Sequence, residues 1–124
     1  MIHDTILVVL EKKGKLLEFA DFIKDYCNQY VNLKIITASC HIGMANFWRK
    51  SLDNNSNSEK KLVAISIILK HIKSAVKETI FMNYYTGGNK PECEIYAEEK
   101  SQEFIGKYIQ HALTLIQKNN GIPT

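Results

Sequence analysis

The sequence predicts one α/β (or α+β) domain over residues 1–124, with a mixed sheet and the element order β-α-β-α-α-β-β-α. Three observations support this prediction. A β-branched apolar run is followed at once by an amphipathic helical pattern. A second apolar run comes directly after that helix, as expected for a right-handed βαβ unit. Two later runs rich in strand-forming residues flank a glycine-containing loop, as in an antiparallel hairpin.

The first part of the chain is expected to supply the parallel strands. Residues 5–10 are continuously apolar, which is typical of a strand buried on both faces, and Gly14 ends this element. Residues 15–30 gather apolar side chains on one arc at helical spacing and acidic side chains on the other. A second strand is predicted over residues 33–38, parallel to the first.

Two helices are predicted next, with a polar connector between them. Residues 44–52 are expected to form a short helix. Residues 53–57, Asp-Asn-Asn-Ser-Asn, have the composition of a mobile connector. Ser58 is a favourable N-cap for a long helix that reaches about Glu78.

The last part of the chain predicts a C-terminal antiparallel hairpin and a helix. Strands are expected over residues 79–85 and 92–97, with a turn over residues 86–91, and the helix over residues 101–118. The resulting order resembles the thioredoxin-like arrangement, a βαβ unit joined to a ββα unit. Because no Cys-x-x-Cys follows the first strand, the resemblance implies that topology without the redox motif.

The composition favours a globular protein of the cytoplasm. Hydrophobic residues make up 45% and charged residues 23% of the 124 residues. The longest apolar run, residues 62–69, is far short of the roughly 20 residues that cross a bilayer. The N-terminal residues lack the pattern of a signal peptide. Cys27, Cys40 and Cys93 are odd in number and widely spaced, which argues against a disulfide framework. We therefore expect a cytoplasmic protein with no membrane partner.

No cofactor and no metal site is predicted. His3, His41, His71 and His111 fall in four separate segments, and no two of them share a helix face at ligand spacing. Gly87-Gly88 is not followed by the Gly-Lys-Ser/Thr of a phosphate-binding loop, so a hairpin turn is its expected role.

The positive charge is concentrated in the centre of the chain. Residues 32–78 carry seven lysines and Arg49 against three acidic residues, a net charge of +5, whereas the two flanking segments carry −1 each. Such a centre favours an acidic protein face, a phosphorylated ligand or nucleic acid. A single arginine argues against specific base reading. The simpler alternative is that Lys70, Lys73 and Lys77 only solvate a surface helix.

The segment Ser39-Cys40-His41-Ile42-Gly43 is the best pocket candidate, because the C-terminal edge of a parallel sheet is where α/β proteins bind ligands. Main-chain N–H groups at a strand-to-helix turn hold anions and lower a thiol pKa. Cys40 is therefore the candidate nucleophile and His41 the candidate base. The string is similar to the phosphocysteine turn of sugar-phosphotransferase B components, which implies a phosphoryl-carrier role. The alternative is a buried Cys40 beside a surface His41.

Three functions are left open by the sequence. The first is a non-catalytic binding or regulatory protein that acts through protein–protein contacts, self-association as a homodimer included. The second is a small cysteine-dependent enzyme or phosphoryl carrier that uses Cys40. The third is weak nucleic-acid or nucleotide binding through the central lysines. The residues assigned to ligand or partner binding are Ser39, Cys40, His41, Gly43, Trp48, Arg49, Lys70, Lys73, Lys77, Tyr84 and Tyr96.

Overall fold

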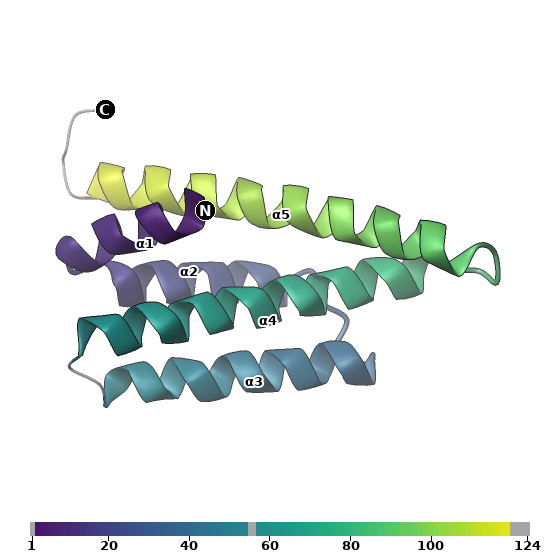
Figure 1. The fold of residues 1–124 in the computed structure, drawn as a ribbon, viewed down its shortest axis with the longest axis horizontal. Helices are drawn as coiled ribbons and strands as arrows, with labels where there is room; N and C mark the ends of the chain where they lie inside the picture. The colour runs from purple at the N-terminus through teal and green to yellow at the C-terminus, as the bar shows by residue number, and fades with distance from the viewer. Residues whose placement is uncertain (1, 55–56, 120–124) are drawn as a thin grey trace.

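The computed structural model describes residues 2–54 and 57–119, and within these ranges it consists of five α-helices and no strand (Figure 1). The prediction of a small α/β domain with a mixed sheet and a C-terminal hairpin is therefore wrong. The helices are α1 (Ile2–Lys12), α2 (Leu16–Asn28), α3 (Ile36–Asp53), α4 (Ser58–Tyr84) and α5 (Lys90–Asn119). Predictions for residues 55–56 of the connector, and for the side chains of His3 and Cys27, lie outside the described residues.

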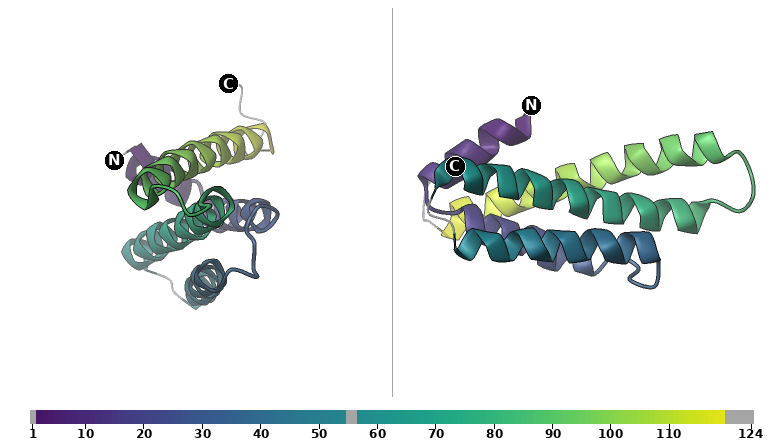
Figure 2. Two further views of the ribbon diagram at one scale, coloured as in Figure 1. Left: turned by 90° about the vertical axis from the view of Figure 1, so that its right-hand side faces the viewer. Right: turned by 60° about the horizontal axis from the view of Figure 1, so that its bottom comes forward.

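Helix α4 is central to the bundle. It packs along α3 and also contacts α5, α2 and α1. Helices α4 and α5 run antiparallel, and the loop that joins them contains Gly87 at a φ of +87° (Figures 1 and 2). This pair extends beyond the other helices at the loop end. Helix α3 lies at the edge of the bundle, where α4 is its principal neighbour.

The predicted first strand is part of helix α1. Leu7 and Leu10 are buried, while Val8 and Val9 between them are exposed. Residues three apart lie on one face of a helix, so the buried face of α1 is a helical one. A run of six apolar residues does not distinguish a strand from a buried helix by its periodicity. Packing against α2 and α4 favours the helix.

The predicted second strand is a loop followed by the first turn of α3. The main-chain N–H of Asn32 donates to Thr79 Oγ1 at 3.2 Å, and the Thr79 hydroxyl donates to the Ala75 carbonyl at 2.9 Å. This contact ties the loop to α4 just before α3 begins. The β-branched residues of this stretch therefore belong to a loop and a helix start, and the βαβ unit does not exist.

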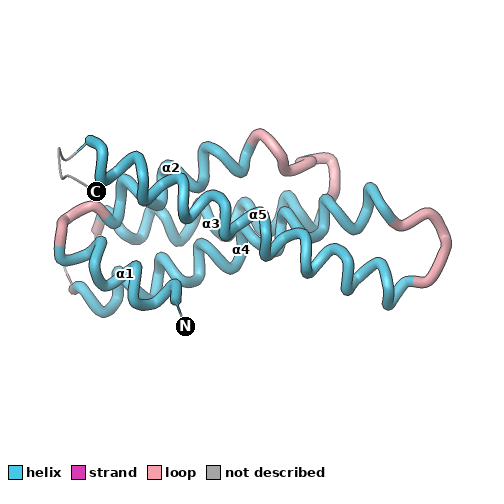
Figure 3. Tube along the Cα trace, turned by 90° about the horizontal axis from the view of Figure 1, so that it is seen from above, coloured by secondary structure: helices cyan, strands magenta, loops and turns pink. Residues whose placement is uncertain are grey.

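The two predicted hairpin strands are also helical (Figure 3). Residues 79–84 complete α4, and residues 92–97 lie in the first turns of α5. A buried row at four-residue spacing runs through the expected boundary between strand and helix, and the thioredoxin-like order is lost with the sheet. This row consists of Cys93, Ala97, Ser101, Ile105 and Ile109.

Four predicted helices are confirmed in place, although three of them are longer than expected. The helix predicted from residue 44 begins at residue 36, and the one predicted from residue 101 begins at residue 90. The N-cap of α4 is Asn57 rather than Ser58, because the Asn57 side chain accepts the main-chain N–H of Lys60 at 3.1 Å.

The buried side chains form one main core and one smaller cluster. The main core lies between α1, α2, α4 and α5, with a contribution from the C-terminal half of α3. The smaller cluster joins the N-terminal half of α3 to α4 through Val31, Ala38, Ile42, Ala75 and Val76. Ala38 of α3 and Ala75 of α4 have small side chains, which lets the two helices lie close together. The buried contacts of α3 are therefore on the side of the helix that faces the bundle.

Candidate functional site

The segment from Ser39 to Gly43 lies inside helix α3 and not at a strand-to-helix turn. The main-chain N–H of Ser39 already donates to the Ile35 carbonyl at 2.9 Å. The anion-holding turn expected at Cys40 is therefore absent. The Cys40 thiol is free and exposed, whereas the His41 ring faces α4. The two side chains point apart and do not form a dyad.

His41 meets His71 of α4 head-on. The two Nδ1 atoms are 2.9 Å apart and the ring centroids are 5.2 Å apart. The distance between the ring centroids equals the N···N distance plus the distance from each centroid to its own Nδ1. Both nitrogens therefore lie on the line that joins the two centroids. One Nδ1 must carry a proton and donate while the other accepts. Ligands of a common metal ion instead point at it from about 2 Å away and at an angle to each other. The geometry is that of a hydrogen bond.

The surroundings of this pair disfavour a second proton. The pKa of His71 lies below its usual value because burial penalises the cation and because His41 and Lys70 repel it. Two protonated rings would face each other with donors only, so the hydrogen bond would be lost and like charges would lie side by side. The contact between α3 and α4 is therefore strongest when at most one ring is protonated.

Arg49 holds α3 against α2. Its Nε and Nη2 donate to the two carboxylate oxygens of Asp21 at 2.6 and 3.0 Å, and its Nη1 donates to Asp53 at 2.9 Å. The hydrogen bond to Asp21 is the largest cause of a raised Arg49 pKa, and the same bond lowers the pKa of Asp21. The guanidinium that the sequence assigned to a ligand is thus occupied by two carboxylates of the protein itself.

The central lysines have two different roles. Lys73 and Lys77 of α4 both bind Glu98 of α5, with Nζ to oxygen distances of 2.5 and 3.1 Å. Their hydrogen bonds lower the pKa of Glu98. Lys70 is exposed beside a groove between α1 and α4. Two of the three lysines predicted to face a partner therefore also join the two long helices.

Tyr84 and Tyr96 lie together near the loop end of the long helices, although they belong to helices and not to a β-hairpin. Their rings stack with centroids 4.2 Å apart and an angle of 20° between their planes. Lys100 Nζ lies 5.8 Å from the centre of the Tyr96 ring. Because the two rings stack on each other, one face of each is not available for stacking with a nucleobase.

The outer side of α3 carries an apolar row that we call the outer stripe: Ile36, Cys40, Met44 and Phe47. Its members are spaced by four, four and three residues, which places them on one helix face opposite the buried Ala38, Ala45 and Leu52. The exposed fractions are 79% for Ile36, 44% for Met44 and 62% for Phe47. Gly43 lies on the same side, and nothing is within 4 Å of the position a Cβ would take there.

A cleft adjoins the outer stripe, and we call it the Trp48 cleft. The rings of Phe47 and Trp48 meet edge to face with centroids 5.9 Å apart, so the stripe continues into the cleft. The cleft measures about 430 Å³ and lies between α3 and the first turns of α4. It is lined by Trp48, Ser51, Glu59, Lys60, Val63 and Ala64.

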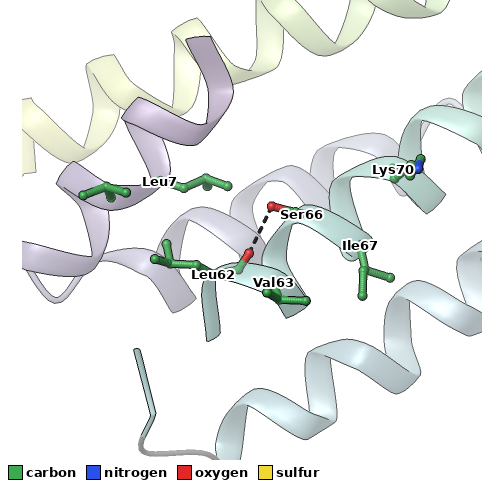
Figure 4. A pocket seen from close by; sticks show the side chains of 7 residues that line it. Leu7, Leu62, Val63, Ser66, Ile67 and Lys70 are labelled. Carbon is green, nitrogen blue, oxygen red and sulfur yellow. Dashed lines mark hydrogen bonds between the residues drawn. The ribbon is translucent and has the colours of Figure 1, made fainter. Parts of the chain in front are cut away.

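A second groove lies between α4 and α1 (Figure 4), and Val63 of α4 lines both this groove and the Trp48 cleft. It measures about 390 Å³, and its walls are the apolar side chains Leu7, Val8, Leu62, Val63 and Ile67 with Ser66 and Lys70. The Ser66 hydroxyl donates to the Leu62 carbonyl at 3.0 Å, so its proton is not available to a ligand. Lys70 is the one charged residue in this lining.

Comparison of the chain with protein-family models, with curated proteins and with solved structures gives no match. Function must therefore be inferred from the molecule's own surfaces.

Over the residues that the structure describes, neither a metal site nor a membrane-spanning helix is found. No group of three or more His, Cys, Asp or Glu side chains in this part of the chain is placed to hold a metal ion. Over the same residues, none of the helices combines the length and the apolar character needed to span a membrane.

Sequence reasoning missed the outer stripe. It assigned Ile36 to a strand, Cys40 to a turn and Met44 and Phe47 to a separate short helix, so their common spacing was divided among three elements. Extending one helical pattern from residue 36 to residue 53 reveals two apolar rows on opposite faces. The His41–His71 contact had no comparable signal, because the two residues belong to different helices.

Proposed function

We propose that this protein is a non-catalytic binding or regulatory protein that holds a partner protein on the outer stripe of α3. The observation that carries the proposal is that α3 has apolar side chains on two opposite faces, of which its own bundle covers one. Exposed apolar side chains are common singly, but a contiguous row over three helical turns is typical of an interaction surface.

The shape of the surface favours a protein partner over a small molecule. Small-molecule sites are concave and surround most of the ligand. The outer stripe is the convex side of a helix, and only the Trp48 cleft beside it is hollow. A protein segment can lie along the stripe and insert one side chain into the cleft.

A cytoplasmic location is part of the proposal. It is supported by the odd number of cysteines and by the free thiols of Cys40 and Cys93, because disulfides are rare in reducing compartments. The two alternative functions have weaker support. The Nδ1 of His41 faces His71 rather than Cys40, and Lys73 and Lys77 are bound to Glu98.

Site-specific photo-cross-linking in cells that produce the protein tests the proposal. A benzophenone amino acid at Phe47 should give an adduct with a distinct protein, and the same amino acid at Ile95, an equally exposed position on α5, should not. The purified partner should then bind the wild-type protein at least tenfold more tightly than Phe47→Ser. Adducts that are the same from both positions, or none from Phe47, would contradict the proposal.

A further inference from the structure

We infer that the segment bound by the outer stripe is an amphipathic α-helix whose apolar face is bordered by acidic side chains. This inference rests on the proposed function and names the chemistry of the partner. Three features of the described surface support it: the main-chain groups of α3 are hydrogen-bonded within the helix, the outer stripe adjoins the Trp48 cleft, and the charges around both are mainly positive.

The main chain of α3 excludes binding by strand addition. A strand that adds to a protein needs a free row of N–H and C=O groups, and in α3 these groups are used within the helix. The partner must therefore bind through side chains and satisfy its own main-chain groups. A helix does this without help, whereas an extended peptide on an apolar surface leaves its main-chain groups unpaired.

The stripe has the dimensions of a helix-binding surface. From Ile36 to Phe47 it covers about three turns, or roughly 17 Å at a rise of 1.5 Å per residue. An amphipathic helix presents anchors at positions i, i+3, i+4 and i+7 over a similar length. Gly43 leaves a low point in the middle of the stripe, and the Trp48 cleft provides space for one large side chain next to Phe47.

The charges on the outer side of α3 are positive. Lys34 lies just before the helix and Lys50 near its end; both are exposed, and neither forms an ion pair with the described residues. Asp53, the carboxylate on α3, is bound to Arg49. A partner helix with carboxylates near both ends would complement these lysines.

Two carboxylates of α4 lie close to this surface and reduce its positive charge without reversing it. Glu78 accepts a hydrogen bond from Thr37 at 3.3 Å, on the flank of α3 that faces α4. Glu59 and Lys60 both line the Trp48 cleft, so the cleft itself is close to neutral. The lysines near the two ends of α3 therefore set the charge preference along the stripe.

The same charges disfavour a second copy of this chain as the occupant. If two α3 helices crossed antiparallel at Gly43, Lys50 of one copy would lie beside Ile36 of the other, next to its Lys34. A parallel pair would place equal lysines opposite each other. Both arrangements bring like charges together at the edges of an apolar contact, which costs free energy.

The interface of a single helix is small, which sets the expected strength of binding. Stable complexes bury about 800 Å² on each partner, and one face of a three-turn helix offers less. We therefore expect a dissociation constant on the order of micromolar, and weaker binding as salt rises.

Two designed peptides test this inference. Both are blocked 18-residue helices with leucines at i, i+3, i+4 and i+7 spacing; one has glutamates beside the leucine face and the other has lysines at the same positions. Fluorescence anisotropy measures their binding to the full chain and to three double variants. Met44→Ser with Phe47→Ser removes the apolar anchors, and Lys34→Glu with Lys50→Glu reverses the edge charges. Lys90→Glu with Lys107→Glu is the control, because both exposed lysines belong to α5.

The expected result is binding of the glutamate peptide and at least tenfold weaker binding of the lysine peptide. The apolar variant should lose at least tenfold in affinity for the glutamate peptide. The Lys34/Lys50 variant should lose about fivefold or more, at roughly 0.5 kcal/mol for each exposed charge, and should gain affinity for the lysine peptide. The control variant should match the wild type.

Three results would overturn the inference, and the first two leave the proposed function intact. Equal binding of both peptides, lost in the apolar variant, would mean that the edge charges do not select the partner. A concentration-dependent dimer in sedimentation, abolished by Phe47→Ser, would identify a second copy as the occupant. Failure of a monomeric protein to bind either peptide would exclude a helix as the bound segment, and the cross-linking at Phe47 would then decide on the proposed function separately.

Discussion

The two faces of α3 carry apolar side chains at similar helical spacing but have opposite environments. Ala38, Ala45 and Leu52 are buried against the bundle, whereas Ile36 and Phe47 lie in solvent. The buried face is explained by stability, because removing apolar surface from water drives folding. The exposed face brings no such gain to the isolated chain. The fold thus accounts for one apolar face of α3, and the proposed partner contact would account for the other.

The largest expected effect compares truncation of the two faces. Leu52→Ala should lower the free energy of unfolding by about 2–5 kcal/mol, because it leaves a cavity in the core, whereas Phe47→Ser should change it by about 0.5 kcal/mol or less. Urea denaturation monitored by circular dichroism measures both. A large loss of stability in Phe47→Ser would mean that the outer stripe is covered within the molecule.

The polar attachment of α3 gives the next largest effect. Arg49→Gln keeps most of the side-chain length but removes the paired hydrogen bonds to Asp21, and should cost about 1 kcal/mol, since the Asp21 carboxylate is half exposed and screened by water. Lys50→Gln, the neighbouring residue without an ion pair, is the matched control and should leave the denaturation midpoint unchanged. Equal effects of the two changes would remove Arg49 as an anchor of α3.

Two exposed glycines within helices sharpen the comparison further. Gly43→Ala in α3 and Gly106→Ala in α5 should each stabilise the chain by roughly 0.5–1 kcal/mol, because alanine is the better helix former and both positions are open. Thermal denaturation measures the gain. The two variants should differ in peptide binding: only Gly43→Ala adds a methyl group within the outer stripe and should weaken it. Identical binding by both would show that the partner does not approach Gly43.

The smallest effect is the pH dependence of the α3–α4 contact. Because the pKa of His71 is lowered in the folded chain, the unfolded chain takes up this proton more readily. Stability is therefore complete above the ordinary histidine value of 6.5 and decreases as the pH falls below it. Urea denaturation between pH 7.5 and pH 5 should show this decrease, and His71→Gln should reduce it. A flat profile for the wild type would exclude the lowered pKa.

The sequence predicted helices well where the helical pattern was long and the polar face was clear. The pattern around Ile65, Ile68 and Ile72 identified most of α4, and the acidic face of residues 15–30 identified α2. It failed for short apolar runs such as residues 5–10, where strand and helix have the same composition. The sequence pattern also did not identify the buried helix face of Cys93, Ala97 and Ser101. These side chains are small and not strongly apolar, and their burial depends on the packing of α5 against α4.

The candidate site residues were selected from a strand-to-helix turn, whereas the structure places this segment within α3. Sequence analysis singled out Cys40, Gly43 and Trp48, which do lie in or beside the surface that now carries the functional proposal. It selected them for the chemistry of a turn that is absent. Arg49 and Lys73 looked available in the sequence, yet Asp21 and Glu98, distant in the chain, occupy them. Such pairings depend on helix packing, which local patterns do not encode.

The head-on contact between His41 and His71 has a consequence for the far side of each ring. In the singly bonded neutral pair, the ring that donates from Nδ1 has a bare Nε2, and the ring that accepts has an Nε2–H. The two imidazoles are therefore locked into opposite tautomers, and neither can switch alone. A group that accepts a hydrogen bond from one Nε2 would fix the tautomer of the other ring as well, on a different helix. Nitrogen chemical shifts would report the two rings as unlike, although both are uncharged.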